Sequence, residues 1–304
     1  MNKGMLLVLA TAVVSGVSIF LNSFAVKNID SFVFTTFKNS VVALLLVPLI
    51  IALKGKPCVI LERKFLPGFL AIGLIGGSIP FFLYFYALSI IPATTAGFIH
   101  KTLFLWAAFF ALLLIREKIS KWFFIAAIFM LLGNYIMSQP KNLFGYGELI
   151  ALAATALWAL ENVIAKKMLI KKEINGMDVA LARMFYGSIF MTIGLLAFMP
   201  NSVLNTYWNF ERVFWLIITA VLLLLYVSTY YNGLKYIEVH KAAGILLLAQ
   251  PITVALSWVF GSSLKYTDLL GSALVVSGFF VLAFASIFVN KVLQKVPICT
   301  KAKH

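Results

Sequence analysis

Five ionisable side chains lie within long apolar runs of the sequence: His100 and Lys101 side by side, with Lys38, Glu161 and Arg183 in other runs. If these runs cross a membrane, a charge within them costs about 2.5–3.5 kcal/mol on insertion scales and is expected to face a bundle interior or a wet cavity. Three bases face one acid, and an unpaired buried charge is costly. We therefore expect the set to bind an anionic group, such as a carboxylate or a phosphate.

Each of these residues also has a structural interpretation, and the sequence leaves both open. Lys38 and Arg183 are also placed to reach the nearer surface or to cap carbonyl groups. Glu161 suits an ion pair with Arg183 as well as proton coupling, and His100 suits a satisfied interior histidine as well as a proton-handling one. Lys101 lies deepest, about a third of the way into its run, which favours ligand binding there.

Aromatic and amide side chains supply a second set of candidate binding residues. Tyr84 and Tyr230 stand at equivalent places in two apolar runs that are rich in aromatic residues, and Trp158 precedes Glu161 by one helical turn. Such rings stack on flat or cationic groups; contact with lipid at the interface is the alternative. Gln250 adds an amide beside Pro251.

Helix breakers mark candidate hinges. Gly76 and Gly77 precede Pro80 in one run, and Pro251 lies in another. A proline removes a helix hydrogen bond and permits bending, in a moving hinge or in a static kink.

The composition indicates what holds these residues. The 304 residues are 62% hydrophobic and only 12% charged, whereas soluble domains average about 45–50% apolar and about 25% charged. Continuous apolar runs of this length predict membrane-spanning helices, and they do not alternate as the strands of a membrane β-barrel do. The net charge of +15 is then explained by basic loops beside the lipid bilayer, so we expect no nucleic-acid partner.

Ten spans are predicted, and all connections between them are short. Their approximate bounds are 5–26, 31–53, 65–90, 93–115, 122–138, 148–168, 179–199, 214–234, 242–260 and 269–289.

The distribution of basic residues supports this count. Of the 25 lysines and arginines, three lie within spans, and Lys27, Lys141, Arg212 and Lys265 fall on the side opposite the N-terminus. The other eighteen fall on the side of the N-terminus. Basic loops face the cytoplasm, so the sequence predicts that both termini are cytoplasmic.

The chain repeats weakly at about half its length. Lys38 aligns with Arg183 at an offset of 145, and Tyr84 with Tyr230 at an offset of 146. Five spans in each half reverse the orientation of the second half, an architecture in which transporters hold substrate near the midplane between repeats. We expect an all-α membrane protein of two inverted five-helix repeats, residues 1–141 and 142–290, followed by a basic cytoplasmic tail, 291–304.

With these features the chain resembles the drug/metabolite transporter superfamily, in its EamA-type branch. The resembling residues are Phe37-Lys38, Ala182-Arg183, the stretch from Tyr86 to Ala96 echoed by Asn232-Gly233-Leu234, the Arg116-Glu117 pair, Leu132-Gly133, Ser277-Gly278 and Pro251. The sequence departs from the family pattern with Ser15-Gly16 in place of Trp-Gly, Ser263 in place of Glu and Lys38 in place of Arg. The resemblance implies efflux or exchange of an amino acid or related small metabolite by alternating access.

Other chemistries lack their motifs. The sequence has no Walker loop, HExxH or GxSxG, and its cysteines, Cys58 and Cys299, have no metal-site spacing. We expect no enzyme activity, no cofactor and no bound metal. The alternative functions are a lipid-linked flippase accessory or a non-transporting membrane scaffold. The predicted location is the inner (plasma) membrane of a prokaryote, as a monomer or homodimer.

Overall fold

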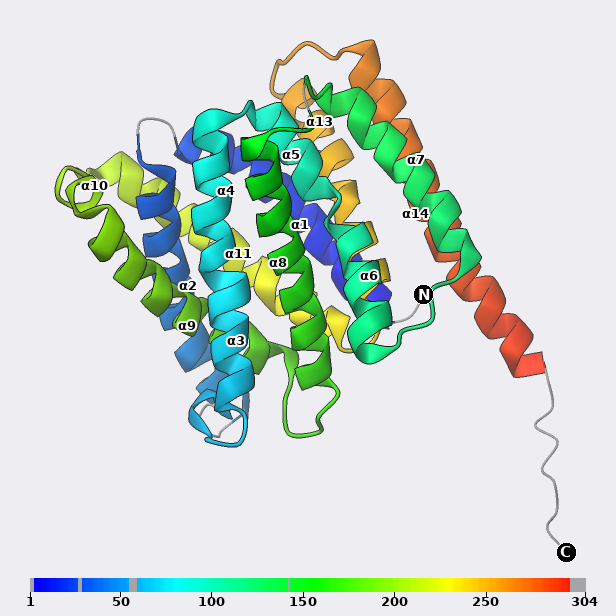
Figure 1. The fold of residues 1–304 in the computed structure, drawn as a ribbon, viewed down its shortest axis with the longest axis horizontal. Helices are drawn as coiled ribbons and strands as arrows, with labels where there is room; N and C mark the ends of the chain where they lie inside the picture. Colours follow the sequence, from blue (N-terminus) through cyan, green and yellow to red (C-terminus); the bar gives the residue numbers. More distant parts are fainter. Residues whose placement is uncertain (1–2, 27–28, 55–58, 142, 296–304) are drawn as a thin grey trace, which may run out of the picture.

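The computed structural model describes the backbone of residues 3–26, 29–54, 59–141 and 143–295, with side chains except at 54 and 285–295. Both cysteines and residues 296–304 of the predicted basic tail lie outside the described residues. Within the described ranges the chain is helical and has no strand, and ten helical spans are long and apolar enough to cross a membrane. The predicted fold class and number of spans, including the short fifth span, are confirmed (Figure 1).

Seven spans are single helices and three are interrupted. The single ones are α1 (Lys3–Ala25), α2 (Ser31–Lys54), α7 (Lys121–Ser138), α8 (Tyr146–Leu169), α9 (Gly176–Phe198), α11 (Phe210–Leu234) and α14 (Tyr266–Lys295). The interrupted ones are α3 and α4 (Leu66–Gly77, Ile79–Ile90), α5 and α6 (Ala93–Lys101, Leu103–Ile115), and α12, η2 and α13 (Val239–Ile245, Leu246–Leu248, Ala249–Val259). Two short elements, η1 (Val59–Leu61) and α10 (Pro200–Leu204), lie in loops.

Polar caps explain why two helices begin earlier than predicted. The eighth span starts at Phe210 because the Asn209 side chain accepts a hydrogen bond from the backbone N–H of Arg212. The seventh starts at Gly176 because Asn175 and Asp178 form a reciprocal capping box. Each cap satisfies backbone donors that the first helical turn leaves free.

The two halves interlock through their first spans. α1 packs on α11, α12, η2 and α13 of the second half, whereas α8 packs mainly on α3, α4, α5 and α6 of the first. α9 also packs on α2 and α3. Each half therefore builds part of its wall from the other, and the interface between the halves runs through the centre of the bundle.

The last spans of the two halves, α7 and α14, pack together along one edge of the bundle (Figure 1). Gly133 lies at their crossing, and a Cβ there would stand 2.5 Å from the carbonyl oxygen of Gly271. Small residues allow such close backbone approach in lipid, where packing rather than the hydrophobic effect holds helices together.

All three helix breaks lie near the middle of the bundle. The third span breaks at Ser78, beside the predicted hinge residues Gly76, Gly77 and Pro80. The ninth span is interrupted by η2, shortly before Pro251, which is a predicted hinge residue. The fourth span breaks at Thr102, directly after Lys101, and this break was not predicted.

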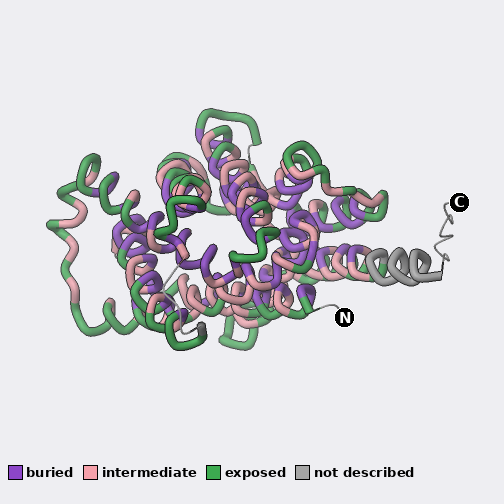
Figure 2. Tube along the Cα trace, turned by 90° about the horizontal axis from the view of Figure 1, so that it is seen from below, coloured by how far each residue is buried: buried purple, intermediate pink, exposed green. Residues whose placement is uncertain are grey.

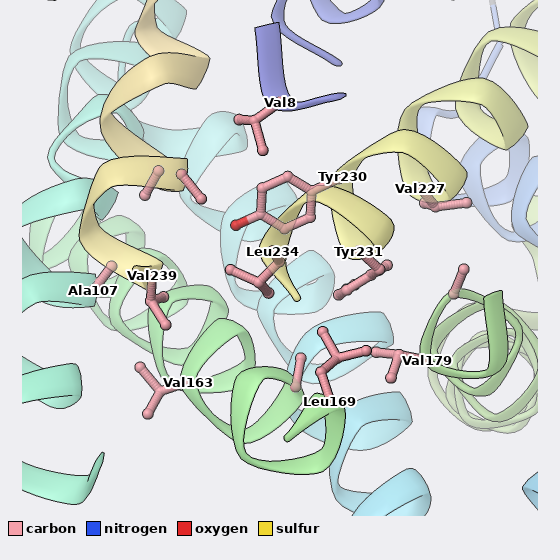
Figure 3. Packing of buried hydrophobic residues seen from close by; sticks show 14 of the residues in the cluster. Val8, Ala107, Val163, Leu169, Val179, Val227, Tyr230, Tyr231, Leu234 and Val239 are labelled. Carbon is pink, nitrogen blue, oxygen red and sulfur yellow. The ribbon is translucent and has the colours of Figure 1, made fainter. Parts of the chain in front are cut away.

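Buried residues lie mainly in the interior of the bundle, and exposed residues lie mainly in the loops and on the outer faces of the helices (Figure 2). One large cluster joins α1, α8, α9, α11 and α12, where Tyr230 packs among Val8 and Leu234 (Figure 3). This apolar packing lies toward the face that carries the N-terminus.

Candidate substrate cavity

A central cavity of about 570 Å³ lies between the two halves. Helices of both halves line it: α1, α2, α4, α5 and α6 from the first, and α8, α9, α11, α12 and η2 from the second. Its volume is within the range of about 300–1,000 Å³ that is usual for small-molecule sites. The interlocked packing of α1 and α8 thus leaves a chamber at the interface of the repeats.

The cavity extends from the middle of the spans to the face opposite the N-terminus. One wall runs from Ser15 in α1 to Val26 just after the end of this helix, a rise of about 16 Å. Ser31 at the start of α2 and Leu88 near the end of α4 also line it on that side. No described loop residue of the N-terminal face lines the cavity, which indicates that this end is closed.

A hydrogen-bonded network forms the floor of the cavity near its closed end. The Arg183 guanidinium donates to the Tyr231 hydroxyl at 3.1 Å, and this hydroxyl donates to Glu161 at 2.7 Å. A second Arg183 nitrogen donates to the Gly76 carbonyl at 3.3 Å. Arg183 and Glu161 are thus joined through Tyr231. One carboxylate oxygen of Glu161 and the Nε of Arg183 are buried without a hydrogen-bond partner.

The proline break in the third span explains why Gly76 can accept these bonds. In a regular helix the N–H of residue 80 would bond to the carbonyl of residue 76, but Pro80 has no N–H. The indole of Trp158 donates to the freed Gly76 carbonyl at 3.0 Å, beside Arg183. A helix break in the first half is therefore held by two side chains of the second.

An aromatic cluster forms one wall of the cavity. The His100 ring lies 5.5 Å from that of Tyr84 and 4.9 Å from that of Trp158. Phe81 lies edge-on to Trp158 at 5.2 Å. His100 Nδ1 is buried without a partner, and these rings present faces and edges suited to a flat or apolar group.

Two lysines of the first half complete the charged lining. Lys38 donates to the side-chain oxygen of Asn22 at 3.3 Å, and its ammonium lies 5.6 Å from the centre of the Phe34 ring. Lys101 ends α5 and lines the cavity. No hydrogen bond or ion pair of Lys101 is found among the described residues.

Charged caps seal the face that carries the N-terminus. The Lys166 ammonium donates to the carbonyls of Leu234, Lys235 and Ile237 at 2.7, 3.2 and 2.8 Å, which closes the end of α11. On the same face, the Glu117 carboxylate accepts from the backbone N–H of Val239 at 3.0 and 3.1 Å.

Two further side-chain contacts lie at the start of α12. Glu117 also lies 3.2 Å from His240 Nδ1. Glu238 pairs with Lys241 at 2.8 Å. Burial opposes ionisation of Glu238, but the hydrogen bond and charge of Lys241 hold its pKa below its ordinary value.

The model of the EamA-like transporter family matches residues 2–139 and again residues 145–284. The chain belongs to the EamA-like transporter family. Members of this family are membrane transporters of small solutes. A comparison with curated protein sequences gave no significant match.

A crystal structure titled only "Crystal structure of protein" shares the fold. The TM-score is 0.79 at 17% identity, over 93% of this chain and 99% of that one. At this identity the likeness shows the fold and no more.

The EamA-like chain brings most of the predicted site residues to one cavity. Its lining includes Lys38, Tyr84, His100, Lys101, Trp158, Glu161 and Arg183. Tyr230 and Gln250 are not among the described lining residues. The Tyr230 hydroxyl and the Gln250 side-chain oxygen are buried without a partner.

Several polar contacts of this EamA-like transporter were not predicted. Tyr231, rather than its neighbour Tyr230, bridges Arg183 and Glu161. Asn22 and Asn39 line the cavity beside Lys38. Amides within apolar spans were a usable signal for the last two, but nothing in the sequence separates the adjacent tyrosines.

Proposed function

We propose that this protein is a secondary transporter that moves a small metabolite, an amino acid or a related compound carrying a negative group, by alternating access. The observation that carries the proposal is a chamber between the repeats, closed at one end, whose described lining holds three basic side chains and one acidic one. A closed end and an open end are what a transporter presents in one of its two states.

The orientation follows from the basic loops. With both termini in the cytoplasm, the cavity opens outward, and the capped end near Glu117 and Lys166 is the cytoplasmic gate. The breaks beside Gly76, Gly77 and Pro80, and before Pro251, are the proposed hinges on which the halves rock. In this proposal the protein acts in efflux or exchange in a prokaryotic inner membrane, as a monomer or homodimer.

Proton coupling is assigned to Glu161, with His100 as a second candidate. The carboxylate lies at the cavity floor with one oxygen unpartnered, and it is linked to Arg183 through Tyr231. Protonation of Glu161 would weaken its attraction to Arg183 and free the guanidinium for an anionic substrate.

Counterflow in vesicles tests the transport proposal. Purified protein is reconstituted, and amino acids, phosphorylated sugars and nucleotides are each offered as the exchanging pair. We expect exchange of at least one anionic compound and a loss of its thermal stabilisation of the protein in Lys101→Ala. If no compound exchanges, and Lys101→Ala matches the wild type in ligand-dependent thermal shift, the proposal is wrong.

An imposed pH gradient tests the coupling. We expect the gradient to drive uptake or efflux by the wild type, and Glu161→Gln to exchange substrate without responding to the gradient. An unchanged pH response in Glu161→Gln would remove this residue from the coupling mechanism.

A further inference from the structure

The charges that line the cavity do not balance. Among the described lining residues, Glu161 is the single acid, and Tyr231 ties it to Arg183. Lys38 has one neutral partner, the Asn22 amide oxygen, and Lys101 has none among the described residues. Two lysines therefore line the cavity without a carboxylate partner in the described part of the chain.

These two lysines lie on different walls. Lys38 comes from α2, where Asn22, Thr35 and Asn39 add amide and hydroxyl groups to the same lining. Lys101 comes from the end of α5, next to the aromatic wall of His100 and Trp158.

The inverted repeat does not require the second charge. At the offset of 146 that relates Tyr84 to Tyr230, the position equivalent to Lys101 is Leu247, which also lines the cavity. A leucine is thus compatible with this place in the fold. The ammonium of Lys101 is a feature of the site rather than of the architecture.

Closure of the chamber makes the imbalance costly. Water around the ammonium groups must leave when the open end closes, and an unpaired charge within hydrocarbon is costly even on the mildest insertion scale. A guest with one negative charge neutralises one lysine and leaves the other. A guest with two negative charges neutralises both.

Resting on the transport function proposed above, we infer that the substrate is a small organic dianion whose negative charges are held by Lys38 and Lys101. Its body lies against the aromatic wall, and the amide and hydroxyl groups around Lys38 bind the oxygens of one acidic group. Two sources supply this chemistry: a dicarboxylate, with its charges on separate groups, and a phosphate monoester, with both on one. Lysines on separate helices suit the dicarboxylate.

Binding to the purified full-length protein tests the charge requirement. The probes are succinate, its monoamide succinamate, glycerol 3-phosphate and zwitterionic alanine, each titrated by ligand-dependent thermal shift. We expect a dianion to bind about tenfold or more tightly than succinamate, equivalent to about 1.4 kcal/mol. A higher affinity for succinate than for glycerol 3-phosphate indicates that the substrate is a dicarboxylate. A higher affinity for glycerol 3-phosphate indicates a phosphate monoester.

Variants that remove one charge test whether the lysines bind the substrate or only support the structure. A purely structural lysine would not change the ratio of the affinities for a dianion and for succinamate. In Lys38→Gln and in Lys101→Gln we expect the preference for the dianion over succinamate to fall to about twofold or less. Lys265→Gln is the matched control, because Lys265 is exposed outside the spans and does not line the cavity. This control is expected to keep the wild-type preference.

Counterflow separates failure of this inference from failure of the transport proposal. Exchange of alanine or succinamate without any preference for a dianion overturns the inference and leaves the transport function standing. A dianion preference that survives in Lys101→Gln also overturns it. Absence of exchange for every probe, together with equal binding of all four, overturns both.

Discussion

Lys38 and Arg183 occupy equivalent positions in the two repeats, yet their surroundings differ. Arg183 donates to the Tyr231 hydroxyl and to the Gly76 carbonyl at the closed end of the cavity. Lys38 lies toward the open end, where its contacts among the described residues are neutral: the Asn22 amide at 3.3 Å and the Phe34 ring at 5.6 Å. The inverted repeat thus supplies the same backbone twice, whereas individual side chains decide which end is held shut.

The helix termini show the same contrast. At the closed end, Glu117 caps the start of α12 and Lys166 caps the end of α11. The residue equivalent to Glu117 in the second half is Ser263, which carries no charge for the other end. Charge-assisted hydrogen bonds are about twice as strong as neutral ones, which favours closure at the face of the N-terminus over closure at the opposite face.

Removing Arg183 at the closed end is expected to cause the largest loss of stability, much larger than removing Lys38. Arg183→Gln leaves Glu161 as a buried carboxylate without a basic neighbour in its network, and loss of one partner of a buried pair costs about 3–5 kcal/mol. Lys38→Gln removes one long hydrogen bond to a neutral group and a contact with the Phe34 ring. We expect a large fall in apparent melting temperature for Arg183→Gln and a small change for Lys38→Gln, measured by thermal unfolding in detergent.

A double variant and a direct comparison of the two single variants test this explanation. Arg183→Gln combined with Glu161→Gln should recover part of the lost stability, because the double variant no longer buries an unpaired charge. Equal shifts for Arg183→Gln and Lys38→Gln would show that the two ends are not held differently.

Adding a methyl group at Gly76 is expected to cause the second largest loss of stability. A Cβ at this position would stand 2.7 Å from Cδ of Glu161, so Gly76→Ala forces the floor network apart at a cost of about 1–3 kcal/mol. Gly97→Ala is the matched control, since a Cβ there meets nothing within 4 Å, and alanine in a helix gains up to about 1 kcal/mol over glycine. We expect opposite shifts in melting temperature and a loss of counterflow in Gly76→Ala only.

How far the sequence alone reaches is clear from particular residues. Apolar runs and basic loops predicted ten spans, because lipid imposes helices and charge imposes sidedness. Lys38, Lys101, Glu161 and Arg183 stood out as candidates because ions are rare in spans, and all four line the cavity. Helix starts at Gly176 and Phe210 were placed three and four residues late because polar caps extend these helices beyond their apolar runs.

Contacts between distant residues and the rotation of each helix could not be predicted from the sequence. The bond from Trp158 to Gly76 joins residues 82 apart, and depends on a carbonyl that Pro80 frees. The choice of Tyr231 over Tyr230 as the bridge depends on the rotation of α11, which its apolar composition leaves undetermined. The break after Lys101 has no proline or glycine next to it to signal it.

The cap at Glu117 gives a third prediction, of intermediate size. Glu117→Gln replaces charge-assisted bonds to Val239 by neutral ones, with a loss of about 1–2 kcal/mol. We expect the face of the N-terminus to open more often, so that Ser15→Cys, in a chain with Cys58 and Cys299 replaced, gains labelling from that face by an impermeant reagent.

Glu62→Gln controls for loss of a carboxylate on the same face, because Glu62 is exposed and outside the spans. Labelling of Ser15→Cys that does not change in Glu117→Gln would argue against the cap as part of the closure.

The smallest effect is expected from the Glu238–Lys241 pair beside this cap. Because the folded-state pKa of Glu238 is lowered, its contribution to stability is present above the unfolded pKa and is lost as pH falls through the folded pKa. Lys241→Gln should remove less than about 1 kcal/mol near neutral pH, since the Glu238 side chain is 43% exposed and solvent screens the pair. Thermal unfolding of wild type and variant over a series of pH values from about 7 downward checks this, and the difference should shrink as pH falls through the folded-state pKa of Glu238. If Lys241→Gln is as unstable as Glu117→Gln, exposed ion pairs stabilise the closed end as much as the buried caps do.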